Sequence, residues 1–188
     1  MNSPHSNGGI TLVELCVALS VLSILAFSAI SFAPSMIQHK RSDAAIKDIF
    51  HLFRLARTEA ITSGSIVTMC PLDLSGRCRN AWNGPVSVFL DPDNSRSLSG
   101  SERIIRQISP PAMGQIQVAP ANRRYFQFGP LGGAKGTLGN VTYCPEHLDD
   151  ARHIRRVIIS FSGRIRRARD KNGDGIVENS DGSSVRCR

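Results

Sequence analysis

The chain begins with one long apolar segment. No charged residue lies between Leu15 and Ile37, and with residues 10–13 the segment exceeds the about 20 residues that a spanning helix needs. We therefore expect a transmembrane helix over residues 10–37. The alternative is a signal peptide cut among the small residues at 26–29, but a signal peptide has a basic start and a shorter apolar core. Residues 1–9 contain no Lys or Arg, which favours the spanning helix.

Apolar residues then recur three and four positions apart, which is the spacing of one face of a helix. They are Ala45, Ile49, Leu52, Phe53, Ala56 and Ala60. Gly64 follows this stripe and is suited to end a helix, because glycine accepts the left-handed conformation of the residue after the last turn. The pattern predicts that the helix continues to about residue 63 and packs its stripe on a globular domain.

From Ser65 onward the helical period gives way to short strand-like runs separated by Gly, Pro, Asn and Ser. The strands that we expect lie at residues 66–70, 86–90, 103–108, 125–128, 141–144, 154–161 and 164–168. The globular part at residues 38–188 is therefore expected to be a helix followed by a β-rich region.

Charge is distributed unevenly over the 188 residues, whose formal net charge is +8. Residues 152–169 contain seven Arg and no acidic residue. Such a cluster suits a polyanion, which means nucleic acid, an anionic membrane surface or an acidic protein face. The alternative interpretation is a solvated pair of strands. Apolar residues make up 41% of the chain, enough to exclude wholesale disorder.

Four cysteines lie in the β-rich part, and an exported domain is expected to oxidise them. Three pairings are open to four cysteines. We favour Cys70–Cys78, which closes a short loop, and Cys144–Cys187, which tethers the C-terminal tail. Zinc binding by Cys144 and His147 is the alternative, but a second well-spaced ligand pair is missing.

Glu14 is the one charged residue inside the apolar segment, where a carboxylate without a partner is costly. The sequence around it, Gly9-Ile10-Thr11-Leu12-Val13-Glu14, resembles the class III leader of type IV pilins and pseudopilins. The resemblance implies that residues 1–9 are a leader peptide and that a prepilin peptidase cuts after Gly9. It also implies that Ile10 becomes N-methylated and that Glu14 pairs with the terminal amine of a neighbouring subunit during assembly.

The interior of the chain is similar to minor pilins of the GspH/FimT family. The residues that show this are the run 67–71 (VTMCP), Cys78, Trp82 and the run 88–91 (VFLD). The resemblance implies an α+β fold, in which a long N-terminal helix packs on a small antiparallel sheet. It also implies an inner-membrane protein with one span and a periplasmic domain, which later enters a surface pilus with other pilins.

The run Gly163-Arg164-Ile165-Arg166 matches the G-R-x-R motif of FimT-type minor pilins. The resemblance implies a DNA-binding site at Gly163, Arg164 and Arg166, with Arg167 and Arg169 adding charge. In an extended segment Arg164 and Arg166 lie on one side, about 6.6 Å apart, which suits contact with phosphates. No aromatic residue is interleaved with these arginines, which argues against a platform for stacking bases.

The segment after the arginines fits a calcium-loop template, except that Asp stands where the last ligand is usually Glu. The candidate ligands are Asp170, Asn172, Asp174, Ile176 and Asp181. The alternative is a turn rich in Asp, Asn and Gly that binds no metal. No cofactor is required by this interpretation, and calcium is an optional ligand.

The sequence thus predicts a minor pilin that binds DNA without sequence preference and aids DNA uptake in natural transformation. The alternative is a structural minor pilin or type II secretion pseudopilin that primes filament assembly without binding DNA. We do not expect an enzyme, because the five His have no evident nucleophile partner and no G-x-S-x-G motif is present.

Overall fold

A computed structural model describes residues 11–30, 33–98, 103–109, 111, 113–146 and 151–187 of the chain. The chain divides into two compact units, Met1–Gln38 and His39–Arg188. We describe each unit by itself. Gly9 and Ile10, the predicted processing site, lie outside the described residues.

The first unit contains helix α1 (Leu12–Ile30). Thr11 caps this helix, because its hydroxyl oxygen accepts a hydrogen bond from the Glu14 amide at 3.2 Å. Cys16 is a free, exposed thiol. Within the described ranges, no helix combines the length and the hydropathy that crossing a membrane requires.

The structure describes α1 as far as Ile30 and α2 (Ala33–Ser63) from Ala33 onward. Residues 31–32, which belong to the helix expected over residues 10–37, lie outside the described residues. Pro34 is the second residue of α2. A proline is tolerated in the first turn of a helix, where its missing N–H has no intrahelical partner to lose.

The end and the buried face of α2 confirm the prediction from spacing. The helix ends at Ser63, and Gly64 follows with a φ of +59°. Of the predicted stripe, Ala45 is half-buried and the other members are buried. Ile46 is also fully buried, which widens the apolar face.

The β-rich part forms two four-stranded antiparallel sheets. The first has the order β3-β2-β1-β5, made of β1 (Val67–Pro71), β2 (Val86–Leu90), β3 (Ile104–Ile108) and β5 (Phe126–Phe128). The second has the order β4-β6-β7-β8, made of β4 (Gln115–Ala119), β6 (Gly139–Cys144), β7 (Arg155–Ile159) and β8 (Ile165–Arg167). A short 3₁₀ helix, η1 (Ala151–His153), precedes β7.

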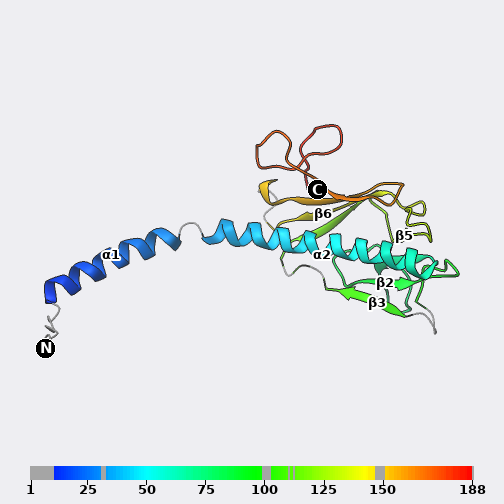
Figure 1. The fold of residues 1–188 in the computed structure, drawn as a ribbon, viewed down its shortest axis with the longest axis horizontal. Helices are drawn as coiled ribbons and strands as arrows, with labels where there is room; N and C mark the ends of the chain where they lie inside the picture. Colours follow the sequence, from blue (N-terminus) through cyan, green and yellow to red (C-terminus); the bar gives the residue numbers. More distant parts are fainter. Residues whose placement is uncertain are drawn as a thin grey trace, which may run out of the picture. The chain divides into compact units, whose positions relative to one another are not determined.

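Helix α2 covers both sheets and shares one hydrophobic core with them. In Figure 1, α2 runs with β6 on one side and β2 and β3 on the other. The Phe53 ring packs edge to face on Phe126 and Phe128 of the first sheet, with centroids 5.0 and 6.3 Å apart. Val157 and Ile159 of the second sheet belong to the same core cluster. The fold is therefore α+β, as the sequence predicts.

Two disulfides join the cysteines as favoured from the sequence. Cys70 is bonded to Cys78, and Cys144 is bonded to Cys187. The second bond fastens the C-terminal segment to the end of β6. Cys144 is thereby excluded as a zinc ligand, and His147 lies outside the described residues.

Candidate functional site

The turn that joins β7 to β8 places the arginine motif. The Gly163 amide donates to the Ser160 carbonyl at 2.9 Å, and the Ser160 amide donates to the Arg164 carbonyl at 3.1 Å. Gly163 has a φ of +73°, which is strained for other residues. A Cβ at this position would lie 1.9 Å from the Gly132 carbonyl oxygen. Glycine at the start of the motif is therefore required by the turn, whether or not it touches a ligand.

Alternation along β8 separates its side chains onto two faces. Ile165 packs against the core, and its strand register pairs it with Ile159. Arg164 and Arg166, on either side of it, are exposed. Neither has an ion pair or side-chain hydrogen bond with the described part of the chain, so both guanidinium groups are available to a ligand.

Arg167 lies on the core-side face and is partly occupied. Its guanidinium lies over the Phe50 ring of α2, 6.0 Å from the ring centroid, and Arg54 lies 5.9 Å from the same centroid. Arg169 is exposed beyond the end of β8. The structure thus places Arg164 and Arg166 together, as the spacing predicts, with Arg167 on the opposite face.

The arginines that precede the motif stabilise the fold. Arg155 donates to the Asp43 carboxylate of α2 at 2.7 Å. Arg156 donates to the Thr142 hydroxyl at 2.8 Å and to the Asn179 side-chain oxygen. Burial lowers the pKa of the Arg156 guanidinium below its usual value, although an arginine stays charged in proteins. The basic stretch therefore contains structural arginines on β7 and two exposed arginines, Arg164 just before β8 and Arg166 within it.

An open groove lies between α2 and β8, and the C-terminal segment extends it at residues 168–171 and 177–179. Its acidic residues are all engaged. Asp43 binds Arg155, and Glu178 accepts hydrogen bonds from the Lys171 and Asn172 amides at 2.8 and 3.3 Å. Asp170 accepts from the Gly175 and Gly173 amides, both at 2.7 Å. None of these hydrogen bonds or ion pairs involves Arg164 or Arg166. Basic residues outnumber acidic residues in the lining, so the groove suits an anion.

Local hydrogen bonds also hold the carboxylates among the predicted calcium ligands. The Gly175 and Gly173 amides hold the pKa of the Asp170 carboxyl below its ordinary value. Asp174 accepts from the Ile176 amide, whereas Asp181 accepts from Ser183 in a separate turn. Among the described residues, no group of three or more His, Cys, Asp or Glu could hold a metal ion. Calcium binding by this loop stays a prediction.

The aromatic side chain Phe161 lies beside the motif, although no aromatic residue is interleaved with the arginines. Phe161 lies in the same turn, three residues before Arg164, and 73% of its surface is exposed. The signal that could have found it is the turn composition Ser160-Phe161-Ser162-Gly163, which places an apolar residue where turns are normally polar.

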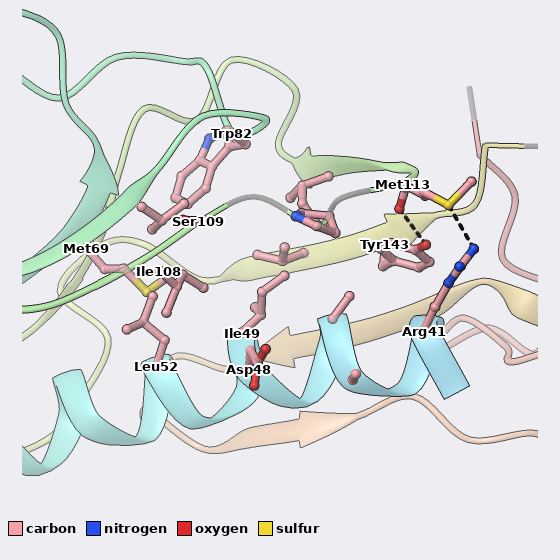
Figure 2. A pocket seen from close by; sticks show the side chains of 16 residues that line it. Arg41, Asp48, Ile49, Leu52, Met69, Trp82, Ile108, Ser109, Met113 and Tyr143 are labelled. Carbon is pink, nitrogen blue, oxygen red and sulfur yellow. Dashed lines mark hydrogen bonds between the residues drawn. The ribbon is translucent and has the colours of Figure 1, made fainter. Parts of the chain in front are cut away.

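A separate apolar pocket of about 380 Å³ lies beneath α2, between the two sheets. Figure 2 shows Ile49 and Leu52 of α2 directed toward Met69 and Ile108 across this space. At its edge, Arg41 donates to the Met113 sulfur at 2.8 Å, and the Tyr143 hydroxyl donates to the Met113 carbonyl at 2.8 Å. The lining is mostly apolar, so the pocket suits an apolar group. Sequence periodicity could not reveal it, because its walls come from segments far apart in the chain.

Comparison with solved structures identifies two crystal forms of the type IV minor pilin FimU of Pseudomonas aeruginosa strain PAO1. The form in space group P65 is 17% identical, with a TM-score of 0.50, and the alignment covers 66% of this chain and 90% of that chain. The form in space group P21 is 16% identical, with a TM-score of 0.52, covering 78% of this chain and 94% of that chain. At this level of sequence identity, the structural similarity shows a shared fold and nothing further. No curated protein matches the chain significantly.

A family model described as type II transport protein GspH matches residues 45–163. The match spans more than half of the chain and ends at Gly163, so the arginines of β8 lie just beyond it. It includes α2 from Ala45 onward, the first sheet, and the second sheet as far as the turn before β8. With a pilin fold and this match, the chain belongs to the GspH family of pilin-like proteins.

Proposed function

We propose that this protein is a minor pilin whose β7–β8 hairpin binds DNA through its phosphates and so aids DNA uptake in natural transformation. The observation that supports this most is which charged side chains of the groove already have partners and which do not. Arg164 and Arg166 are exposed and have no acidic partner among the described residues, whereas the acids of the groove accept hydrogen bonds from Arg155 and from backbone amides. Guanidinium groups bind phosphate oxygens through paired hydrogen bonds, which position the backbone without reading the bases.

The proposal includes the path by which the hairpin reaches DNA. A prepilin peptidase would cut after Gly9, Ile10 would become N-methylated, and the protein would be held at the inner membrane. Glu14 lies in the first turn of α1, within the first four residues. There its carboxylate would pair with the terminal amine of a neighbouring pilin when the subunits assemble. The hairpin would then be carried into the pilus, with no catalytic step.

DNA binding is tested with the full chain in detergent and a fluorescently labelled duplex at low salt. The variant Arg164→Gln plus Arg166→Gln removes two charges from the hairpin. We expect its affinity to fall at least about tenfold, because even one hydrogen bond to a charged group contributes about 1.5–3 kcal/mol and 1.4 kcal/mol is a factor of about ten.

The matched control is Arg103→Gln plus Arg106→Gln, which removes the same charge from exposed positions at and beside β3, in the other sheet. Its affinity should remain close to that of the wild type. Equal losses in the two double variants, or no binding by the wild type at low salt, would reject the hairpin as a DNA site.

The second candidate is a structural pseudopilin that primes filament assembly without binding DNA. The observation that favours it is the family description, type II transport protein. Experiments in cells can distinguish the two functions. If the Arg164 and Arg166 variant assembles filaments normally but takes up less DNA, the first function is supported. If it assembles fewer filaments and binds DNA normally, the second is supported.

A further inference from the structure

Phe161 is an aromatic side chain that is largely exposed. Among the large hydrophobic side chains that are exposed in the described part of the chain, it is the one aromatic. By contrast, Phe53, Phe126 and Phe128 are fully buried, and Trp82 is 5% exposed. No ring or guanidinium in the described residues lies against the Phe161 ring. A solvent-exposed phenyl ring at a loop tip gains free energy when a flat apolar surface covers it.

The backbone holds this ring in place on a fixed turn. The Phe161 carbonyl accepts a hydrogen bond from the Ala134 amide at 3.0 Å, and the turn is closed by the 2.9 Å bond from Gly163 to Ser160. The Gly163 Cα fits against the Gly132 carbonyl, with no space for a side chain. Because the turn is anchored on both sides, the ring is presented without an ordering cost for the backbone.

The ring and the free charges share one hairpin. Phe161 lies at the tip, Arg164 is the first residue after the turn, and Arg166 follows two residues later on the exposed face. A strand of nucleic acid offers the same two chemistries in alternation, a flat base and an anionic phosphate. In a duplex the base faces are covered by their neighbours, so a phenyl ring can stack only on an unpaired base.

We propose that Phe161 stacks on an unpaired nucleobase while Arg164 and Arg166 hold the adjacent phosphates, so that the hairpin prefers single-stranded nucleic acid. This inference rests on the proposed function, because it requires the hairpin to bind nucleic acid. The preference is independent of sequence, since every base has a flat face. An anionic membrane is the competing partner, because Leu131 on the neighbouring turn is 97% exposed. The polar residues Ser160 and Ser162 beside the ring favour a strand over a lipid surface.

The experiment measures binding of the full chain in detergent to three probes at one low salt concentration. The probes are an oligothymidylate, an abasic strand of the same length and a duplex. The abasic strand retains the phosphates and lacks the bases. We expect the wild type to bind oligothymidylate about 5- to 150-fold more tightly than the abasic strand, which is the contribution of stacking one base.

Two variants of the ring and one matched control make the test specific. Phe161→Leu should lose the preference for oligothymidylate and leave abasic and duplex binding unchanged, because leucine is apolar but cannot stack. Phe161→Trp should keep or increase the preference. Leu74→Ala is the control, because Leu74 is a fully exposed apolar residue in another turn, and its removal should change none of the affinities.

The outcomes separate the two proposals. Equal binding of oligothymidylate and abasic strand would overturn stacking, and the proposed DNA function would survive if both strands still depend on Arg164 and Arg166. Binding of no probe would overturn both proposals. If Phe161→Leu weakens binding to phosphatidylglycerol vesicles and leaves oligothymidylate binding unchanged, stacking is overturned in favour of a membrane surface.

Discussion

The arginine side chains of residues 152–169 have different roles, and the groups within hydrogen-bonding distance of each side chain determine its role. Arg155 and Arg156 are consecutive residues of β7. Arg155 pairs with Asp43 of α2, whereas Arg156 donates to Thr142 and Asn179. Arg164 and Arg166 reach no acid of the described residues. The Arg155 side chain is 15% exposed, so redirecting it toward a ligand is costly because its hydrogen bond to Asp43 must break. Arg164 and Arg166 are therefore the arginines of residues 152–169 that are best placed to bind a ligand.

At the same scale, Asp170 makes the stability of the C-terminal loop depend on pH. Its carboxylate accepts two backbone hydrogen bonds, first from Gly175 and then from Gly173, which lower its pKa. A lowered pKa in the folded state contributes stability above the ordinary value of about 3.9. That contribution is lost as the pH falls through the folded pKa. We therefore expect Asp170→Asn to lower the melting temperature at neutral pH and to have a smaller effect in acid.

The measurement for Asp170 is thermal unfolding of wild type and variant at several pH values. Asp48→Asn is the control, because it removes the same charge from an exposed position of α2 that has no hydrogen bond to the described residues. A constant difference between wild type and Asp170→Asn at all pH values would contradict the role given to the carboxylate.

At the scale of elements, the face of α2 that covers the sheets supplies much of the core. Phe53 is fully buried and packs edge to face on Phe126 and Phe128. Phe53→Ala removes a large buried side chain and leaves a cavity, so we expect it to reduce the free energy of unfolding by about 3–5 kcal/mol. Denaturant unfolding measures this change.

Phe161→Ala is the matched control for Phe53→Ala, because the same atoms are removed from an exposed ring. Its effect on the free energy of unfolding should stay within about 0.5 kcal/mol. A large loss of stability in Phe161→Ala would show that the ring supports the fold, and would weaken the case for a ligand.

Element boundaries show where sequence patterns are sufficient and where they fail. The strands expected at 66–70 and 86–90 correspond to β1 and β2, because their residues are almost all buried and β-branched or apolar. Strand β4 (Gln115–Ala119) was not predicted. Two of its five residues are polar, and only Ile116 is buried. Its pairing with β6 decides that it is a strand, which is a contact between distant segments.

At the scale of the whole molecule, the net charge of +8 predicts binding to DNA that weakens with salt. The logarithm of the affinity should fall by about 0.9 for each phosphate neutralised, per logarithm of salt. The Arg164 and Arg166 double variant should therefore reduce the slope by about 1.8. Titration of a duplex at several salt concentrations measures the slopes.

The Arg103 and Arg106 double variant tests whether position or total charge sets that slope. Its net charge equals that of the hairpin variant, so an effect of total charge would change both slopes equally. Only a local site predicts that the control keeps the wild-type slope.

The sequence by itself determined the features that depend on neighbours along the chain. The amphipathic stripe and Gly64 predict where α2 packs and ends, and the alternation around Ile165 predicts that Arg164 and Arg166 share a face. Such features follow from helix and strand periods, which are local.

The tertiary structure alone decided which charges are free. Asp43 neutralises Arg155 from a different element, and the Gly175 amide donates a hydrogen bond to Asp170. It also decided that the Phe161 ring stays exposed beside the free arginines, on a turn held by Gly132 and Ala134. These outcomes depend on segments that are distant in sequence and meet only when the chain folds, so no local pattern encodes them.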